Sequence, residues 1–158
     1  MEIEYITGDI FEGDEEYVIQ GCNSRGVCQS GICKVIREKY PNCYKIYFEA
    51  YRKNGNTLDL GDIIWADVGD RVIGNAITQQ NFGRDPSTVY VSYDAIEKVI
   101  KTINAELGDL DNPPSIAFPL IGAGLANGSW KNISGIIEEF SETFVPVVYL
   151  LDGKIPEN

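Results

Sequence analysis

Two glycine-rich segments contain the residues best suited to binding an anion. The first runs from Ser24 to Gly31 and the second from Gly122 to Ser129, and each lies between an apolar run and a helical pattern. Glycine lets the backbone approach a ligand closely and adopt positive φ, so that consecutive amides can converge on an anion. Two such segments would suit a diphosphate, although either one alone is equally compatible with an ordinary tight turn.

Several familiar catalytic motifs are absent. No Gly-Lys-Ser/Thr triplet follows the second segment, and its glycines lack the spacing of a dinucleotide-binding fingerprint. No arginine lies six residues after Cys22, Cys28 or Cys33, so cysteine-dependent phosphatase chemistry is unsupported. Histidine is absent altogether, and the chain therefore lacks the usual general base near neutral pH.

The elements that position these segments alternate between strands and helices. At 158 residues and 44% hydrophobic, the chain has the size of one domain, which we expect to span residues 1–152 with a short tail at 153–158. Ser129 is a predicted N-cap, and Pro41 should end a helix. Apolar runs predict strands near residues 2–6, 17–22, 62–66, 71–77, 115–121 and 146–151, with a weaker short strand at 88–91.

Helical periodicity completes the pattern. Predicted helices cover residues 31–40, 42–53, 93–107 and 130–143. The alternation indicates a layered α/β fold with a largely mixed sheet, in which ligands usually lie at the carboxyl ends of the strands.

Charge and cysteine content limit the classes of partner. A net charge of −11 argues against duplex nucleic acid, although backbone amides at a helix N-terminus can still bind a small phosphorylated ligand. The four cysteines do not form CxxC pairs and the chain shows no secretory signal, so we expect free thiols, no metal or cofactor, and a cytoplasmic protein. No segment is apolar enough to span a membrane, and a monomer is the default expectation.

These motifs together resemble those of a macrodomain. The resemblance spans nearly the whole chain and rests, in order, on residues 7–10, 22–23, 26–31 and 119–125. Within that superfamily, the chain most resembles the ADP-ribose-1″-phosphate phosphatase branch, including small versions encoded by phages. The segments that carry this narrower resemblance are 21–23, 76–79, 82–85 and 124–130.

The resemblance implies a three-layer α/β/α fold with a central mixed sheet that binds ADP-ribose or ADP-ribose-1″-phosphate. Asp9 would accept a hydrogen bond from the adenine amino group beside the Ile10 backbone, and Asn23 would contact the distal ribose. Each has a structural alternative, which is a cap for Asp9 and an Asx-turn for Asn23. Residues that would present backbone amides to the diphosphate are Gly31, Ile32, Gly122, Ala123, Gly124 and Leu125.

The catalytic residues are harder to assign, because a histidine has been considered catalytic in the cellular phosphatases that this chain resembles. Our leading hypothesis places the terminal phosphate near Asn23, with Asp85 orienting or deprotonating a water and Arg84 offsetting phosphoryl charge. Asp85 could instead only form a turn before Pro86.

Two rival functions remain open. One is a catalytically silent ADP-ribose reader or scavenger. The other is a deacylase or deribosylase, although the glutamate-directed hydrolases use a lysine and an aspartate where Gln79 and Ala126 stand here. Trp130 could line the pocket, but as the first residue of an amphipathic helix it is expected to pack in the core.

Overall fold

The computed structural model describes all 158 residues and contains one six-stranded sheet in the order β1-β6-β5-β2-β4-β3. All neighbouring strands are parallel except β3, which runs antiparallel to β4 at one edge. The strands are β1 (Glu4–Thr7), β2 (Tyr17–Asn23), β3 (Ile63–Asp67), β4 (Val72–Gln79), β5 (Ser115–Phe118) and β6 (Val145–Leu150).

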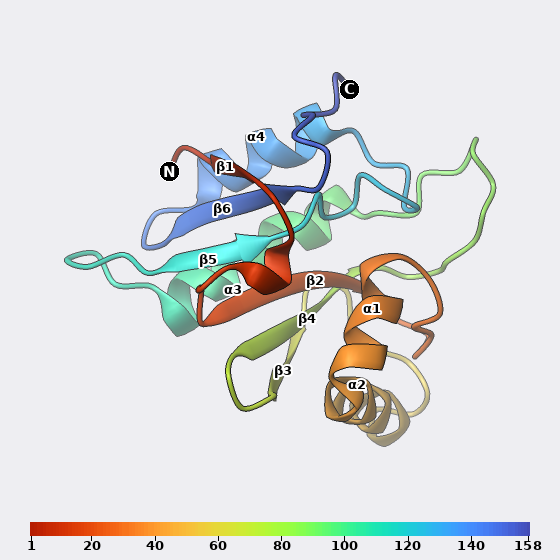
Figure 1. Cartoon of the computed structure of the whole chain (residues 1–158). Helices are drawn as coiled ribbons and strands as arrows, with labels where there is room; N and C mark the ends of the chain where they lie inside the picture. The colour runs from red at the N-terminus through yellow and green to blue at the C-terminus, as the bar shows by residue number, and fades with distance from the viewer.

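Helices cover both faces of this sheet. In Figure 1, α1 and α2 lie together on one side, and α3 and α4 lie on the other. The helices are α1 (Gly31–Lys39), α2 (Pro41–Lys53), α3 (Tyr93–Leu107) and α4 (Trp130–Phe140). The expected three-layer α/β/α fold with a mixed sheet is confirmed.

Alternation along the central strands explains why both faces are covered. In β4, Ala76 packs in the cluster under α3 and α4, whereas its neighbour Ile77 packs with Tyr47 of α2 on the opposite face. Successive side chains in a strand point to opposite faces, so a strand that is apolar at every position must be buried on both. The core is therefore divided by the sheet into two parts.

The predicted elements are found with small differences at their ends. Pro41 is the first residue of α2, and the Ser129 hydroxyl accepts a hydrogen bond from the amide of Asn132 (3.2 Å), which confirms it as the N-cap of α4. β5 ends at Phe118 because Pro119, which has no N–H, follows it. The expected strand at 88–91 is reduced to one isolated bridge between Gln79 and Val91.

Trp130 packs in the core, as its position at the start of an amphipathic helix predicts. Its side chain is 1% exposed, and its indole Nε1 donates to the hydroxyl of Tyr5 (3.0 Å), which ties α4 to β1. None of the helices is both long and apolar enough to cross a membrane.

Replacing Trp130 tests the core on the α4 side of the sheet. Trp130→Ala should lower the free energy of unfolding by about 3–5 kcal/mol, because it removes a large buried ring and leaves a cavity. Tyr5→Phe, which only removes the partner of the indole, should cost about 1 kcal/mol. Denaturant titrations would measure both, with Leu110→Ala as the control because Leu110 is 77% exposed. A loss for Trp130→Ala as small as that control would contradict the assignment.

Candidate functional site

A cavity of about 520 Å³ lies at the carboxyl ends of β2, β4 and β5. Three connections surround it: the first loop (residues 24–30), the second loop (residues 119–129) and the third loop (residues 80–92). The carboxyl ends of neighbouring parallel strands meet at one edge of the sheet, and this brings together segments that are far apart in the sequence. The predicted site residues that line the cavity are Asn23, Gly31, Ile32, Arg84, Gly122, Gly124 and Leu125.

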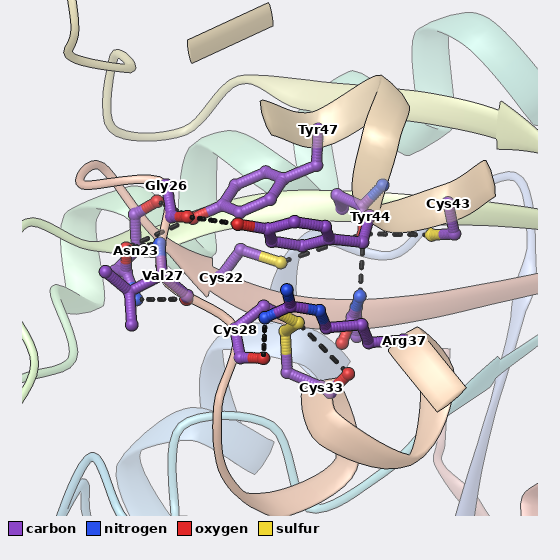
Figure 2. Close-up of a disulfide and its surroundings, with 12 residues drawn as sticks. Cys22, Asn23, Gly26, Val27, Cys28, Cys33, Arg37, Cys43, Tyr44 and Tyr47 are labelled. Atoms are coloured by element: carbon purple, nitrogen blue, oxygen red, sulfur yellow. Dashed lines mark hydrogen bonds between the residues drawn. A yellow bond between two sulfur atoms is a disulfide. The ribbon is translucent and has the colours of Figure 1, made fainter. Parts of the chain in front are cut away.

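Asn23 shapes the first loop from within. Its Oδ1 accepts hydrogen bonds from the amides of Arg25 (3.0 Å) and Val27 (3.3 Å), and its Nδ2 donates to the Val27 carbonyl (2.8 Å). Figure 2 shows Asn23 beside Val27 at the start of the loop. The Asx-turn that the sequence allowed is therefore present, and one Nδ2 hydrogen remains for a ligand.

Aromatic side chains of α2 support the same loop (Figure 2). The Tyr47 hydroxyl donates to the Asn23 carbonyl (2.6 Å), and because burial raises the pKa of Tyr47, this hydroxyl stays protonated. The Tyr44 hydroxyl donates to the Gly26 carbonyl (3.3 Å). Gly26 has φ +73°, and a Cβ there would lie 2.8 Å from the Tyr51 ring, so this position needs glycine. In the sequence, the helical spacing of Tyr44, Tyr47 and Tyr51 indicates only packing, so it does not predict these tyrosines as parts of the site.

A disulfide between Cys28 and Cys33 closes the end of the first loop against the first turn of α1 (Figure 2). The expectation of four free thiols is therefore wrong for these two. Their Cα atoms lie 5.4 Å apart, within the range that a disulfide requires, because the chain turns sharply into α1 between them. Both half-cystines line the cavity, so the bond restrains the backbone there.

The other two cysteines are free and buried. Burial raises the pKa of both the Cys22 and the Cys43 thiol, so neither is a ready nucleophile. Cys22 lines the cavity.

The second loop is held by its own backbone. The amide of Gly128 donates to the Gly122 carbonyl (2.8 Å), and Gly122 has φ +77°. A Cβ on Gly128 would lie 2.5 Å from that same carbonyl oxygen, so no larger residue fits. The side chain of Asn127 donates to the carbonyls of Asp85 (3.0 Å) and Thr88 (2.8 Å), which fixes the second loop to the third.

Backbone amides without partners distinguish this cavity. Of the six amides that the sequence analysis assigned to a diphosphate, only that of Ala123 donates within the protein, to the Leu120 carbonyl at 3.1 Å. Ile32 and Gly122 are half-buried, where an N–H without a partner is costly, whereas Gly31, Gly124 and Leu125 are exposed, so their amides are open to a ligand or to water. The five without any hydrogen bond to the protein belong to Gly31, Ile32, Gly122, Gly124 and Leu125.

Arg84 provides the only cationic side chain in the cavity lining, and no carboxylate lines it. Asp85 lies outside the lining and uses both carboxylate oxygens within its own turn. Oδ1 accepts from the amide (2.9 Å) and hydroxyl (2.7 Å) of Ser87, and Oδ2 accepts from the Thr88 hydroxyl (3.0 Å). These bonds, those from Ser87 first, lower the pKa of Asp85. The contacts correspond to the turn that the sequence analysis allowed.

Asp9 and Ile10 also lie outside the lining of the cavity. The Asp9 Oδ1 accepts from the Phe11 amide (2.9 Å) and caps a single-turn 3₁₀ helix, η1 (Ile10–Glu12), which the sequence did not predict. Arg71 secures that turn by donating to the carbonyls of Ile10 (3.5 Å), Phe11 (3.3 Å) and Gly13 (3.3 Å). Asp9 therefore forms the cap, and its second oxygen remains free of the protein.

Three further residues of the lining were not predicted as site residues. The Thr78 hydroxyl is buried and has no partner, and Phe82 is 52% exposed. Gln79 donates through Nε2 to the Asn81 carbonyl (2.8 Å). Their position at the end of β4 and in the third loop could have predicted them as cavity residues, because β4 ends beside β2.

Comparisons with known proteins agree with this geometry. No family model matches the chain. An ADP-ribose 1″-phosphate phosphatase from Candida albicans is 27% identical over 146 residues, which cover 87% of this chain and 93% of that protein. The macrodomain of Thermus aquaticus DarG superposes with a TM-score of 0.75 at 25% identity, covering 93% of this chain and 96% of that one. Thermosipho africanus DarTG in complex with ADP-ribose has the same fold, with a TM-score of 0.76 at 17% identity over 98% of this chain and 43% of that one.

Gly31 offers a direct test of the unpaired amides. Its φ is +61°, and a Cβ there would meet only the side chain of Leu125, at 3.7 Å, so the protein has room for a larger residue. Gly31→Val should weaken ADP-ribose binding at least tenfold in calorimetry, because a branched side chain keeps a phosphate away from the backbone.

Gly55→Val provides the matched control. Gly55 has φ +72° with nothing within 4 Å, and it lies outside the cavity. Both variants should lose a similar 1–2 kcal/mol of stability through backbone strain, about the cost of the left-handed region for a residue with a Cβ, but only Gly31→Val should lose affinity. Equal affinity of the two variants would remove Gly31 from the site.

Proposed function

We propose that this chain is a macrodomain that binds ADP-ribose and hydrolyses the phosphomonoester of ADP-ribose-1″-phosphate. The observation that carries the proposal is the set of five unpaired backbone amides around the cavity. The similarity to a protein named as that phosphatase supports the choice of reaction.

The diphosphate is bound by backbone rather than by basic side chains. In this proposal the amides of Gly31 and Ile32, at the N-terminus of α1, face the diphosphate from one side, and those of Gly122, Gly124 and Leu125 face it from the other. Amides at a helix N-terminus carry partial positive charge and need no desolvated ammonium or guanidinium group. This explains how a protein with a net charge of −11 can hold an anionic ligand.

The two ends of the ligand have different surroundings. The adenine is assigned to Asp9 and Ile10, where the second carboxylate oxygen of Asp9 is available to the exocyclic amine. The distal ribose and its phosphate are assigned to the part of the cavity lined by Asn23 and Arg84, where one Nδ2 hydrogen and a guanidinium are free. Arg84 forms no ion pair within the protein, so its charge is available to the phosphate.

The reaction needs little acid–base chemistry. A water oxygen attacks the phosphorus, and the bond between phosphorus and the ribose oxygen breaks. The proton that the water loses passes to that ribose oxygen, so that inorganic phosphate and ADP-ribose leave. The transition state of such a transfer is usually loose, with charge spread over the phosphoryl oxygens, so positioning and electrostatic stabilisation supply most of the rate. A cavity with amides, one arginine and no histidine suits that requirement.

Asp85 takes a positioning role in this mechanism. Its carboxylate is engaged by Ser87 and Thr88, and its lowered pKa makes it a weaker base than a free aspartate. The turn that it forms directly follows Arg84, so in this proposal it fixes the backbone from which the Arg84 side chain extends. This revises our initial hypothesis, in which Asp85 activates the water.

A phosphate-release assay tests the function. Purified protein with ADP-ribose-1″-phosphate should release one phosphate per substrate and leave unmodified ADP-ribose, and calorimetry should show micromolar binding of that product. Binding without release would make the protein a reader or scavenger. No binding at millimolar ADP-ribose would reject the whole proposal.

Substitutions in the third loop test the mechanism. Arg84→Ala should weaken binding of ADP-ribose-1″-phosphate more than that of ADP-ribose, and should lower kcat at least tenfold, because only the phosphorylated ligand presents the extra dianion. Asp85→Asn should lower kcat less than about tenfold, since an amide oxygen can still accept from Ser87. A general base typically contributes about 100-fold or more, so a loss of that size for Asp85→Asn would make Asp85 the base after all.

A further inference from the structure

Charge is divided very unevenly along this acidic chain. Residues 24–53, which form the first loop, α1 and α2, contain seven of the 13 cationic side chains and only two of the 24 acidic ones. That segment therefore has a formal charge of +5, and the other 6 cationic and 22 acidic side chains give the rest of the chain −16. Although the net charge of the chain is −11, residues 24–53 form a basic layer on one side of the sheet.

Every cation in this layer is exposed and none forms an ion pair. All three ion pairs of the protein lie elsewhere, on Arg71, Lys98 and Lys101. Unpaired, solvated charges of one sign attract a polyanion through counterion release. The exposed cations of the basic layer are Arg25, Lys34, Arg37, Lys39, Lys45, Arg52 and Lys53.

Aromatic rings accompany these charges. On α2, Phe48 stacks on Tyr44 (ring centroids 5.7 Å apart) and contacts Tyr51 (5.6 Å), and all three rings are partly exposed. The Arg37 guanidinium lies 3.8 Å from the centre of the Tyr44 ring, so α1 and α2 share one mixed cationic and aromatic surface (Figure 2).

We propose that the basic layer formed by residues 24–53 binds single-stranded nucleic acid. Cationic side chains that follow a backbone of phosphates, together with partly exposed rings and guanidinium planes for the bases, are the two components of single-strand binding. An acidic protein segment would use the cations but has no bases to stack on the rings. This function is independent of the proposed phosphatase activity.

The position of the layer directs a bound strand toward the cavity. The first loop belongs to both, since Val27 and Cys28 line the cavity while Arg25 is exposed beside them. At the opposite end of β4 from the cavity, the turn of the β3–β4 hairpin carries Asp67 and Asp70, which repel phosphate. A single strand of nucleic acid on the basic layer is thus bordered by acidic side chains at the hairpin and by the open cavity at the first loop.

The overall negative charge does not prevent this binding. The Debye length is about 10 Å at 0.1 M salt, whereas a chain of this length has a radius of gyration of about 15 Å, so acids on the far side of the sheet are largely screened. The expectation that the chain does not bind duplex nucleic acid rests on the net charge of the whole chain and stays a prediction, whereas binding of a single strand depends on the local charge of the basic layer.

Fluorescence anisotropy with a labelled 20-nucleotide oligothymidylate tests the proposal. The parent protein should bind with micromolar affinity at 50 mM salt. A triple variant on one side of α2, Lys45→Glu with Arg52→Glu and Lys53→Glu, should bind at least tenfold more weakly. The slope of log K against log salt should fall by about 2 units, because three phosphate contacts are lost from a single strand.

A second triple variant provides the matched control. Lys101→Glu with Lys131→Glu and Lys154→Glu changes the net charge by the same amount with exposed cations outside the layer, and it should bind as the parent does. Unchanged ADP-ribose binding by both variants would show that each is folded. If the α2 variant does not fold, the same three positions changed to glutamine replace it.

Three results would overturn the proposal. The first is no oligothymidylate binding by the parent at 50 mM salt, and the second is an equal loss in both triple variants. The third is equally tight binding of a polyglutamate of the same length, which would assign the surface to acidic proteins. None of them bears on the phosphatase activity, which is measured by phosphate release.

Discussion

Backbone amides that face the cavity must stay unpaired while the loops that carry them stay fixed. In a helix or sheet the same hydrogen bonds that fix the backbone also consume its amides. The two glycine-rich loops need another source of rigidity, because any internal partner for Gly31 or Gly124 would remove a donor from the site. Side-chain hydrogen bonds and a disulfide around the two loops satisfy that requirement.

Side chains and one covalent bond provide the rigidity. The Asn23 side chain and the Tyr47 hydroxyl hold the start of the first loop, and the bond between Cys28 and Cys33 holds its end. None of these contacts uses the amides of Gly31 and Ile32, which remain free. Asn127 does the same for the second loop by donating to two carbonyls of the third. These contacts leave the amides of Gly31, Ile32, Gly122, Gly124 and Leu125 without a partner in the protein, so they do not compete with a ligand for them.

Local pattern was sufficient to predict the helices and strands and a layered α/β fold with a mixed sheet, and the resemblance to macrodomains added the three-layer arrangement. All six strands and four helices follow from apolar alternation, helical periodicity and caps such as Ser129, because these signals lie within a few residues of the elements that they specify. The glycines of both loops could be assigned to the cavity for the same reason. What could not be predicted depends on neighbours distant in sequence: Tyr47 beneath Asn23, Arg71 behind Ile10, and Asn127 against Asp85.

The roles of polar side chains are the least predictable part of the site. Asn23, Asp9 and Asp85 could each bind a ligand or cap a turn, and all three form turn or cap hydrogen bonds here. The two uses are compatible where a donor or acceptor remains, as with the second hydrogen of Asn23 Nδ2, but both oxygens of Asp85 are engaged. Residue type therefore predicts which groups are present, whereas the remaining hydrogen-bonding capacity decides which of them can act on a ligand.

Positive and negative charge lie on different parts of the surface, just as the sheet separates the core into two parts. Positive potential in the cavity comes from backbone amides and from Arg84. In the neighbouring basic layer it comes from exposed cationic side chains, and the rest of the surface is acidic. A small anion needs only the amides, because a few short hydrogen bonds in a half-enclosed cavity suffice. A long polyanion needs many solvated cations instead, since each phosphate contributes a small, salt-dependent increment. Two anion-binding surfaces of different physical kind can therefore lie side by side on a chain whose net charge is negative.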